Sequence, residues 1–383
     1  MKKKNLLVKV LSLSLALFLL AGCGNNGIST NGEQPESGGE SASGGSYTIS
    51  LSSHQSSSSV HHYTVAEFKS RVEERTGGAV TINLFEDAQL GNERDNIEGV
   101  QMGTIQMCLA DTGYVANLLK DYNILQLPFI FRDYDHLNKV LGGEIVAAMD
   151  EKLIEQTGIR ALGWYPDGLR DFLMNTPVEE VSDFKGCKLR AMESDVVIDC
   201  IEALGAAATP IAWGEVYTSI QTNVVEGLEA APTSLYTSKF YEVADKLIMT
   251  DHINLGVTLL MNEQFFQSMP EEYQQVILDV MREIADEQQQ NTVSQQEGAV
   301  EQLKAEGVTV IEIDKEACQE ACMTTWDKYA AEVENGQDII DAILAVEKFL
   351  TMTQVRRQAF AVSPEYAEEI RRSLFVGENW ENF

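Results

Sequence analysis

Residues 268–306 restrict the possible architecture of this chain more than any other segment. Apolar residues recur at helical spacing through the first half, and no helix-stopping signal occurs before Gly307. The pattern predicts one helix of about 36 residues, roughly 54 Å long at the standard rise. Its middle, residues 286–297, is almost wholly polar. Apolar ends and a polar middle are typical of a helix that spans two lobes and is exposed between them.

A capping pattern marks the start of this helix. Ser268 and Glu271 have the S-x-x-E spacing, with Pro270 in the first turn. The alternative to one long helix is two helices that break near Gly298. A strand at 308–313 is expected to follow in the second lobe.

Strands and helices alternate in the rest of the folded region. Alternating apolar residues predict strands at 47–51, 80–84 and 105–110, with helices between them. A further strand is expected at 160–164. The same order restarts at about Leu169, which predicts a mostly parallel sheet with helices on both faces.

Two apolar strand-like runs come later, at 246–250 and 256–262, with His252-Ile253-Asn254 between them. We interpret this junction as the point where the chain crosses back into the first lobe. Several crossovers and one long helix together predict a clamshell of two lobes with a hinge.

The first 46 residues predict export and anchoring. A basic start precedes an apolar run at 10–20, which is short for a membrane span, and small residues precede Cys23. This arrangement resembles the lipobox of bacterial lipoproteins, in which Cys23 is lipidated and becomes the new first residue. The alternative is an ordinary signal peptide with a chance cysteine. The Gly/Ser/Glu-rich stretch behind it predicts a flexible tether on the outer side of the cell membrane.

The charge balance limits the possible partners. The chain has 28 Lys and Arg against 59 Asp and Glu, a formal net charge of −31. Such a surface argues against binding to nucleic acid and against electrostatic docking on anionic lipid. Solubility is the plainest explanation of the acid excess.

The cysteines do not predict a complete disulfide framework. Apart from Cys23, five remain, which is an odd number. Cys318 and Cys322 lie one helical turn apart, a spacing that would also suit a metal site. Because no histidine lies near them in sequence, we expect two buried small apolar side chains and no bound metal.

No enzyme motif occurs in the sequence. Serine-hydrolase, zinc-protease, phosphate-binding-loop and dinucleotide-binding signatures are all missing. The adjacent His61 and His62 have no carboxylate or cysteine at metal-ligand spacing, so we expect a pair on a helix surface. The chain is therefore predicted to be a binding protein without a cofactor.

Two arginines point to an anion site instead. Arg170 and Arg190 lie at the ends of strands that open the second lobe, where open α/β sheets place their ligands. A charged residue in a buried strand must be paired or must await an anion. A guanidinium matches the two oxygens of a carboxylate. An internal salt bridge is the alternative.

The sequence contains the long ordered motifs KGCKLRAMES, TPIAWGEVYTSIQTNVVEGLE and, earlier, the turn Gln89-Leu90-Gly91. Together these motifs resemble the DctP family of TRAP-transporter solute-binding proteins. The resemblance runs from about Tyr47 to Val346. It implies an α/β fold, a two-lobe clamshell like the periplasmic binding proteins, with a long helix crossing both lobes. It also implies capture of an organic acid and delivery to separate membrane permease subunits, driven by an ion gradient without ATP.

The resemblance also implies a set of site residues. Arg190 matches the arginine that pairs with the ligand carboxylate, and Arg170 matches a second arginine that assists. Trp213 holds a position where an aromatic ring covers the ligand. Asp111 matches an acidic position of the first lobe, and His54 follows the first strand in a loop that approaches the ligand.

One position departs from the pattern of the resemblance. Ala230, directly after the candidate ligand-binding residue Glu229, stands where many members that bind sialic acid or dicarboxylates carry Asn. The substrate of this chain therefore cannot be inferred from the substrates of those family members. Anion capture beside Asp111, Glu229 and an aromatic face suits a hexuronate-like sugar acid better than a C4-dicarboxylate, which ranks second.

The expected organisation has four parts, and we expect a monomer. Two other functions stay open: an exported hydrolase that uses a pair of carboxylates, and a ligand-sensing lobe for a signalling partner. The expected boundaries are a signal peptide at 1–22, the lipidated tether at 23–46, the binding domain at 47–346 and an extension of unknown role at 347–383. Lobe 1 is expected at about 47–165 and 256–285, and lobe 2 at about 168–253 and 300–346.

Overall fold

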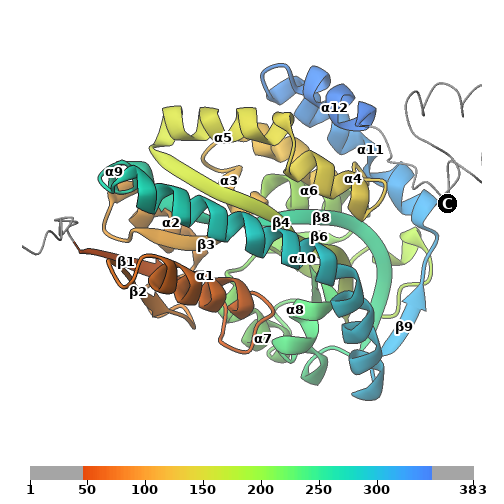
Figure 1. The fold of residues 1–383 in the computed structure, drawn as a ribbon. Helices are drawn as coiled ribbons and strands as arrows, with labels where there is room; N and C mark the ends of the chain where they lie inside the picture. Colours follow the sequence, from red (N-terminus) through yellow and green to blue (C-terminus); the bar gives the residue numbers. More distant parts are fainter. Residues whose placement is uncertain (1–45, 347–383) are drawn as a thin grey trace, which may run out of the picture. The chain divides into compact units, whose positions relative to one another are not determined.

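The computed structural model describes residues 46–346 (Figure 1). The predicted signal peptide, Cys23, all but the last residue of the tether, and the extension at 347–383 lie outside the described residues. Within the described range, no helix has both the length and the apolar character that a membrane crossing requires.

A mixed sheet of nine strands organises this part of the chain. The strand order is β2-β1-β3-β8-β4-β7-β5-β6, and β9 pairs with β8 outside this path. The strands are β1 (Tyr47–Ser52), β2 (Val80–Phe85), β3 (Met107–Asp111), β4 (Ile159–Met174), β5 (Lys188–Ala191), β6 (Ala207–Pro210), β7 (Gly227–Ala230), β8 (Lys246–Asn262) and β9 (Thr309–Glu312).

The prediction of a mostly parallel sheet is correct at the two ends of this order and wrong in its middle. Parallel pairing joins β1 to β2 and β3, and joins β5 to β6 and β7. The central pairs β3/β8, β8/β4 and β4/β7 are antiparallel. Strand β8 runs opposite to both of its neighbours, β3 and β4, and β4 also runs opposite to β7.

Strands β4 and β8 are each continuous, although the sequence predicted two separate strands in each place. They have 16 and 17 residues and pair along most of their length. Register shifts interrupt the pairing between Ala161 and Trp164, between Pro166 and Leu169, and around Asp171. The breaks in the apolar pattern are therefore bulges within a strand, which bend it without ending it.

Helices pack on the sheet around three clusters of buried apolar side chains. The start of α2 is determined by its local sequence, because the N-cap Asn92 forms a reciprocal capping box with Asp95. The helices are α1 (His62–Arg75), α2 (Glu93–Met102), α3 (Thr112–Val115), α4 (Tyr134–Leu141), α5 (Glu144–Thr157), α6 (Asp195–Ala203), α7 (Trp213–Gln221), α8 (Pro232–Thr237), α9 (Glu263–Gln267), α10 (Glu271–Ala305), α11 (Lys315–Glu332) and α12 (Gly336–Ala345), with short 3-10 turns η1 (Lys120–Gln126), η2 (Val181–Phe184) and η3 (Phe240–Glu242).

The long helix is confirmed as α10, an uninterrupted helix of 35 residues that passes through Gly298. It lies along β4, contacts α1 through residues near its own middle, such as Glu283 and Glu287, and also contacts α8 (Figure 1). The predicted cap is wrong, because Pro270 occupies the N-cap position without a side-chain bond. Ser268 ends α9 instead, and its hydroxyl donates to the carbonyl of Phe265 at 2.6 Å.

The polar middle of α10 is largely exposed, as predicted, but one of its faces is buried, which the sequence did not predict. Gln288, Thr292 and Gln296 follow at intervals of four and are each less than 9% exposed. Gln296 accepts from the Leu169 amide at 2.9 Å and donates to the Leu169 carbonyl at 3.2 Å. The bulges of β4 leave backbone groups without a neighbouring strand, and Gln296 satisfies those of Leu169. Gln288 donates instead to the Thr64 hydroxyl of α1, at 3.0 Å.

Gly168 permits this close approach. Its φ of +131° lies in the region that favours glycine, and a Cβ there would lie 3.1 Å from Gln296 Oε1. The segment where β4 bends is therefore held to α10 by hydrogen bonds.

Candidate functional site

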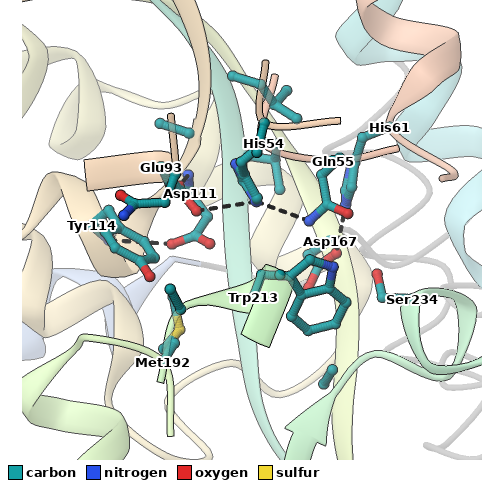
Figure 2. Close-up of a pocket in the computed structure, with 18 of the residues that line it drawn as sticks. His54, Gln55, His61, Glu93, Asp111, Tyr114, Asp167, Met192, Trp213 and Ser234 are labelled. Atoms are coloured by element: carbon teal, nitrogen blue, oxygen red, sulfur yellow. Dashed lines mark hydrogen bonds and ion pairs between the residues drawn. The ribbon is translucent and has the colours of Figure 1, made fainter. Parts of the chain in front are cut away.

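One pocket collects most of the predicted site residues (Figure 2). It lies where four strands, β1, β3, β5 and β6, reach their carboxyl ends. This is the usual position of a ligand site in an open α/β sheet. Five of the six predicted ligand residues line it: His54, Asp111, Arg170, Arg190 and Trp213.

Arg190 reaches the pocket from β5 and is only 2% exposed. Its Nε donates to the Ile211 carbonyl at 2.9 Å, and its guanidinium carbon lies 5.5 Å from the centre of the Trp213 ring. Nη1 has no hydrogen-bond partner among the described residues, and no carboxylate there forms an ion pair with it. Burial lowers the pKa of Arg190, yet an arginine remains charged in proteins.

Arg170 is instead fully engaged within the protein. Its Nε donates to Glu229 Oε2, Nη2 donates to Oε1 of the same carboxylate at 3.0 Å, and Nη1 donates to Asp167 Oδ2 at 2.9 Å. Burial acts to lower the pKa of Arg170, but Glu229 and Asp167 outweigh it, so the pKa is raised. The internal salt bridge that the sequence left open therefore exists, at Arg170.

Glu229 does not line the pocket. It lies on β7 with no exposed surface, and both of its carboxylate oxygens accept from Arg170. Its neighbour Ala230 does line the pocket, and the small side chain leaves open space there. The prediction thus identified the correct strand, β7, but selected Glu229, which does not line the pocket, in place of Ala230, which does.

The first-lobe side of the pocket is acidic. Asp111 Oδ1 caps α3 by accepting from the amides of Gly113 and Tyr114 at 2.8 and 3.2 Å. Glu93 Oε1 accepts from the Asp111 amide at 2.9 Å, and Glu93 Oε2 lies 3.3 Å from His54 Nε2. Burial raises the pKa of Asp111 to about 6. Burial, and then Asp111, raise the pKa of Glu93 well above its usual range.

His54 is neutral in this setting. Burial lowers its pKa to about 3, with smaller contributions from His61 and Arg190. Because the ring is neutral, its contact with Glu93 is a hydrogen bond and not an ion pair. Gln55 Nε2 also lies 2.9 Å from His54 Nε2, while His54 Nδ1 is buried without a partner in the described structure (Figure 2).

Several site residues were not predicted, namely Gln55, His61, Glu93, Tyr114, Asp167, Met192 and Ser234. The expectation that His61 and His62 form a surface pair is wrong for His61, which is 5% exposed. His61 Nε2 lies 3.2 Å from Asp167 Oδ1, and Nδ1 lies 3.1 Å from the Tyr165 hydroxyl. The burial of His61 depends on β4, which is about a hundred residues away, so no local pattern could reveal it.

Among the described residues, no group of His, Cys, Asp and Glu side chains is arranged to hold a metal ion. The pocket offers one guanidinium with open donors, four carboxyl groups and two imidazoles. Such a set can bind an anion and can exchange hydrogen bonds with hydroxyl groups.

A pH prediction follows from His54. Because its folded pKa is about 3 and an unfolded histidine titrates near ~6.5, the unfolded chain binds more protons between these values. The free energy of unfolding contributed by His54 is therefore intact above that range and is lost as the pH falls through it. His54→Gln should lose less stability between pH ~7 and ~5 than the parent does.

Urea unfolding at the two pH values measures this difference. His62→Gln is the matched control, because its side chain is 41% exposed, and it should not reduce the loss in acid. An equal loss in acid for His54→Gln and the parent would contradict the assignment of a neutral buried ring.

The fold and the site together define a class of protein, a receptor that holds a small anionic ligand. The model of the bacterial extracellular solute-binding protein family 7, DctP, matches residues 51–332. The chain belongs to this family. The predicted resemblance is therefore confirmed, and with it the α/β two-lobe fold of the TRAP solute-binding proteins.

Named relatives agree with this assignment. The 2,3-diketo-L-gulonate-binding periplasmic protein YiaO of Escherichia coli is 30% identical over 289 residues, which is 75% of this chain and 88% of that protein. The C4-dicarboxylate-binding periplasmic protein DctP of Rhodobacter capsulatus is 30% identical over 285 residues, 73% of this chain and 85% of that protein.

A solved structure is similar as well. A TRAP periplasmic solute-binding protein from Sulfitobacter, with bound β-D-galacturonate, superposes with a TM-score of 0.74 at 29% identity, covering 78% of this chain and 99% of that one. The protein is thus an extracytoplasmic receptor for organic acids. Members of this family are transport receptors, so the prediction that the chain is not an enzyme is confirmed and the hydrolase alternative is excluded.

Proposed function

We propose that this receptor binds a hexuronate-like sugar acid and delivers it to the permease of a TRAP transporter. The observation that carries the proposal is the buried Arg190, whose Nη1 donor has no partner in the described structure. A buried cation with an open planar fork is costly unless an anion completes it. A carboxylate offers two oxygens that match this fork.

The hydroxyl groups of a sugar acid suit the opposite wall. Glu93, Asp111 and Asp167 supply oxygens, and His54 Nδ1 is a buried ring nitrogen without a partner. Hydroxyl groups both donate and accept, so they fit carboxyl groups in either protonation state. Trp213 provides a flat apolar face beside Arg190. Similarity to receptors named for diketogulonate and galacturonate supports the same class.

A C4-dicarboxylate is the second candidate, because burial raises the pKa of Glu93 and of Asp111. A protonated carboxyl group can donate to a second carboxylate, where an ionised one would repel it. Similarity to the Rhodobacter capsulatus receptor supports this alternative.

Ligand binding is proposed to close the two lobes, at about 47–165 with 256–285 and at 168–253 with 300–346. The pocket takes residues from both sets, so a ligand that contacts both favours the closed form. The bulged part of β4 beside Gln296 is the proposed hinge. We further propose that the receptor is a monomer anchored through lipid on Cys23.

A thermal-shift screen tests the substrate class. The purified protein is heated with D-galacturonate, D-glucuronate, succinate, malate or orotate, and with neutral D-galactose as the matched control. A ligand that binds only the folded form raises the melting temperature. We expect the largest rise with a hexuronate and none with galactose.

The outcomes separate the candidates. The largest shift with succinate or malate would replace the sugar acid by a dicarboxylate. A shift with galactose equal to that with galacturonate would contradict capture of a carboxylate by Arg190. No shift with any acid of the panel would overturn the proposal.

A further inference from the structure

Two cysteines from distant parts of the chain face each other beneath the surface. Cys200 lies on α6 and Cys322 on α11, 122 residues apart in sequence, and their sulfur atoms are 3.6 Å apart. Both side chains are at most 1% exposed. Helices α6 and α11 pack against each other, so the contact is part of a helix interface.

The two sulfur atoms are in direct non-bonded contact. A disulfide holds its sulfurs about 2 Å apart, so an approach of roughly 1.5 Å is needed. Rotation about the Cα–Cβ bonds of the two cysteines can supply part of this approach. In the sequence Cys322 stands with Cys318 as one of two apolar side chains on a single helix, and no local pattern indicates Cys200 as its partner.

The other cysteines are poorer partners. Cys318 and Cys322 are four residues apart on α11, which puts their Cβ atoms about 5–6 Å apart, whereas a disulfide needs about 3.5–4.5 Å. Cys187 donates to the Asp183 carbonyl, and Cys108 lies in β3 within the core. Cys200 with Cys322 is therefore the favoured pair among the described cysteines.

We propose that Cys200 and Cys322 form a structural disulfide that fastens α11 to α6. The extracytoplasmic location favours formation of this disulfide, because proteins there meet disulfide-type oxidants that cytosolic proteins do not. One cysteine thiolate attacks the oxidant disulfide and releases one thiolate; the second cysteine attacks the mixed disulfide and releases the other. The two cysteines lose two protons and two electrons, and the oxidant becomes two thiols.

The bond forms while the chain folds. After folding, an oxidant cannot reach sulfurs that are covered by two helices. The contact with Cys322, and then burial, raise the pKa of Cys200, so the reactive thiolate is scarce in the folded chain. The state set during folding therefore persists: a chain folded with oxidant stays linked, and a chain folded with reductant stays open.

Refolding in two redox states tests the proposal. The full chain with Cys23→Ser, which leaves five of its six cysteines, is unfolded with reductant. It is refolded in a glutathione and glutathione disulfide mixture or with reductant alone. Thiols are then alkylated in denaturant, intact mass counts the labels, and peptide mapping locates the link. We expect three labels and a Cys200–Cys322 link with oxidant, and five labels with reductant.

Stability and control variants complete the test. The linked form should melt several degrees higher than the open form, because the bond closes a long loop in the unfolded chain. Cys200→Ala should carry four labels and lose this difference, whereas Cys187→Ala should keep the link and carry two labels. Native protein isolated from an exporting host without reductant, alkylated in the same way, gives a reading that needs no refolding.

Five labels in both preparations of the parent, or a link that joins another pair, would overturn the proposal. The result does not depend on the ligand. A failed ligand screen and a failed disulfide test are therefore independent.

Discussion

Arg190→Lys should weaken binding of the acid that stabilises the parent most by roughly 30-fold to several thousand-fold, although the charge is kept. A lysine cannot make the planar pair of hydrogen bonds, and it cannot keep the bond from Nε to the Ile211 carbonyl that orients the side chain. Losing one partner of a buried charge pair typically costs ~2–5 kcal/mol, which gives this range. Calorimetry on both proteins measures it.

Lys188→Met is the matched control, because Lys188 lies on the same strand β5 but is exposed. Its affinity should stay within about threefold of the parent. Circular dichroism and the melting temperature show whether Arg190→Lys still folds. A folded Arg190→Lys protein that binds within about threefold of the parent would remove Arg190 from the site.

Arg170→Met should act mainly on stability. Removing the arginine leaves Glu229 buried with no compensating charge, and breaking such a pair costs about 3–5 kcal/mol of the free energy of unfolding. Urea unfolding at neutral pH measures the loss. The double variant Arg170→Met/Glu229→Gln should recover part of the loss, because the uncompensated charge of Glu229 is gone while Asp167 still lacks its arginine partner.

Arg190 and Arg170 are thus distinguished by two measurements: calorimetry reports the loss of affinity expected for Arg190, and urea unfolding reports the loss of stability expected for Arg170. Glu229→Gln alone should also destabilise, since Arg170 then keeps only Asp167 as a charged partner. If Arg170→Met is as stable as the parent and loses affinity as Arg190→Lys does, Arg170 contacts the ligand directly and its ion pair with Glu229 is incidental.

Features with a strong local signal could be predicted from the sequence. The regular apolar spacing after Pro270 predicted α10 nearly to its ends, because a helix of 35 residues repeats the helical spacing of apolar residues many times. Arg190 could be selected because a charged residue in an apolar strand is costly unless it has a role. Family resemblance then added Trp213, Asp111 and His54, all of which line the pocket.

Features that depend on distant partners could not be predicted. Arg170 looked like Arg190 in sequence, and only the fold brings Glu229, 59 residues later, against its guanidinium. The buried face in the polar middle of α10 could not be recognised, because the partners of Gln296 include backbone groups of β4, which carry no sequence signal. Bulges in β4 and β8 break the apolar alternation, so one strand was interpreted as two.

The pairing of β3 with the distant strand β8 also affects the order in which parts of this protein can fold. Strand β3 pairs with residues 257–261 of β8, which leave the ribosome about 150 residues after β3 itself. Until they arrive, one edge of β3 has no antiparallel neighbour, so the first lobe cannot finish folding on its own. Contacts this distant in sequence slow folding. The pairing of β3 with β8 therefore makes slow completion of the first lobe a property of the topology itself.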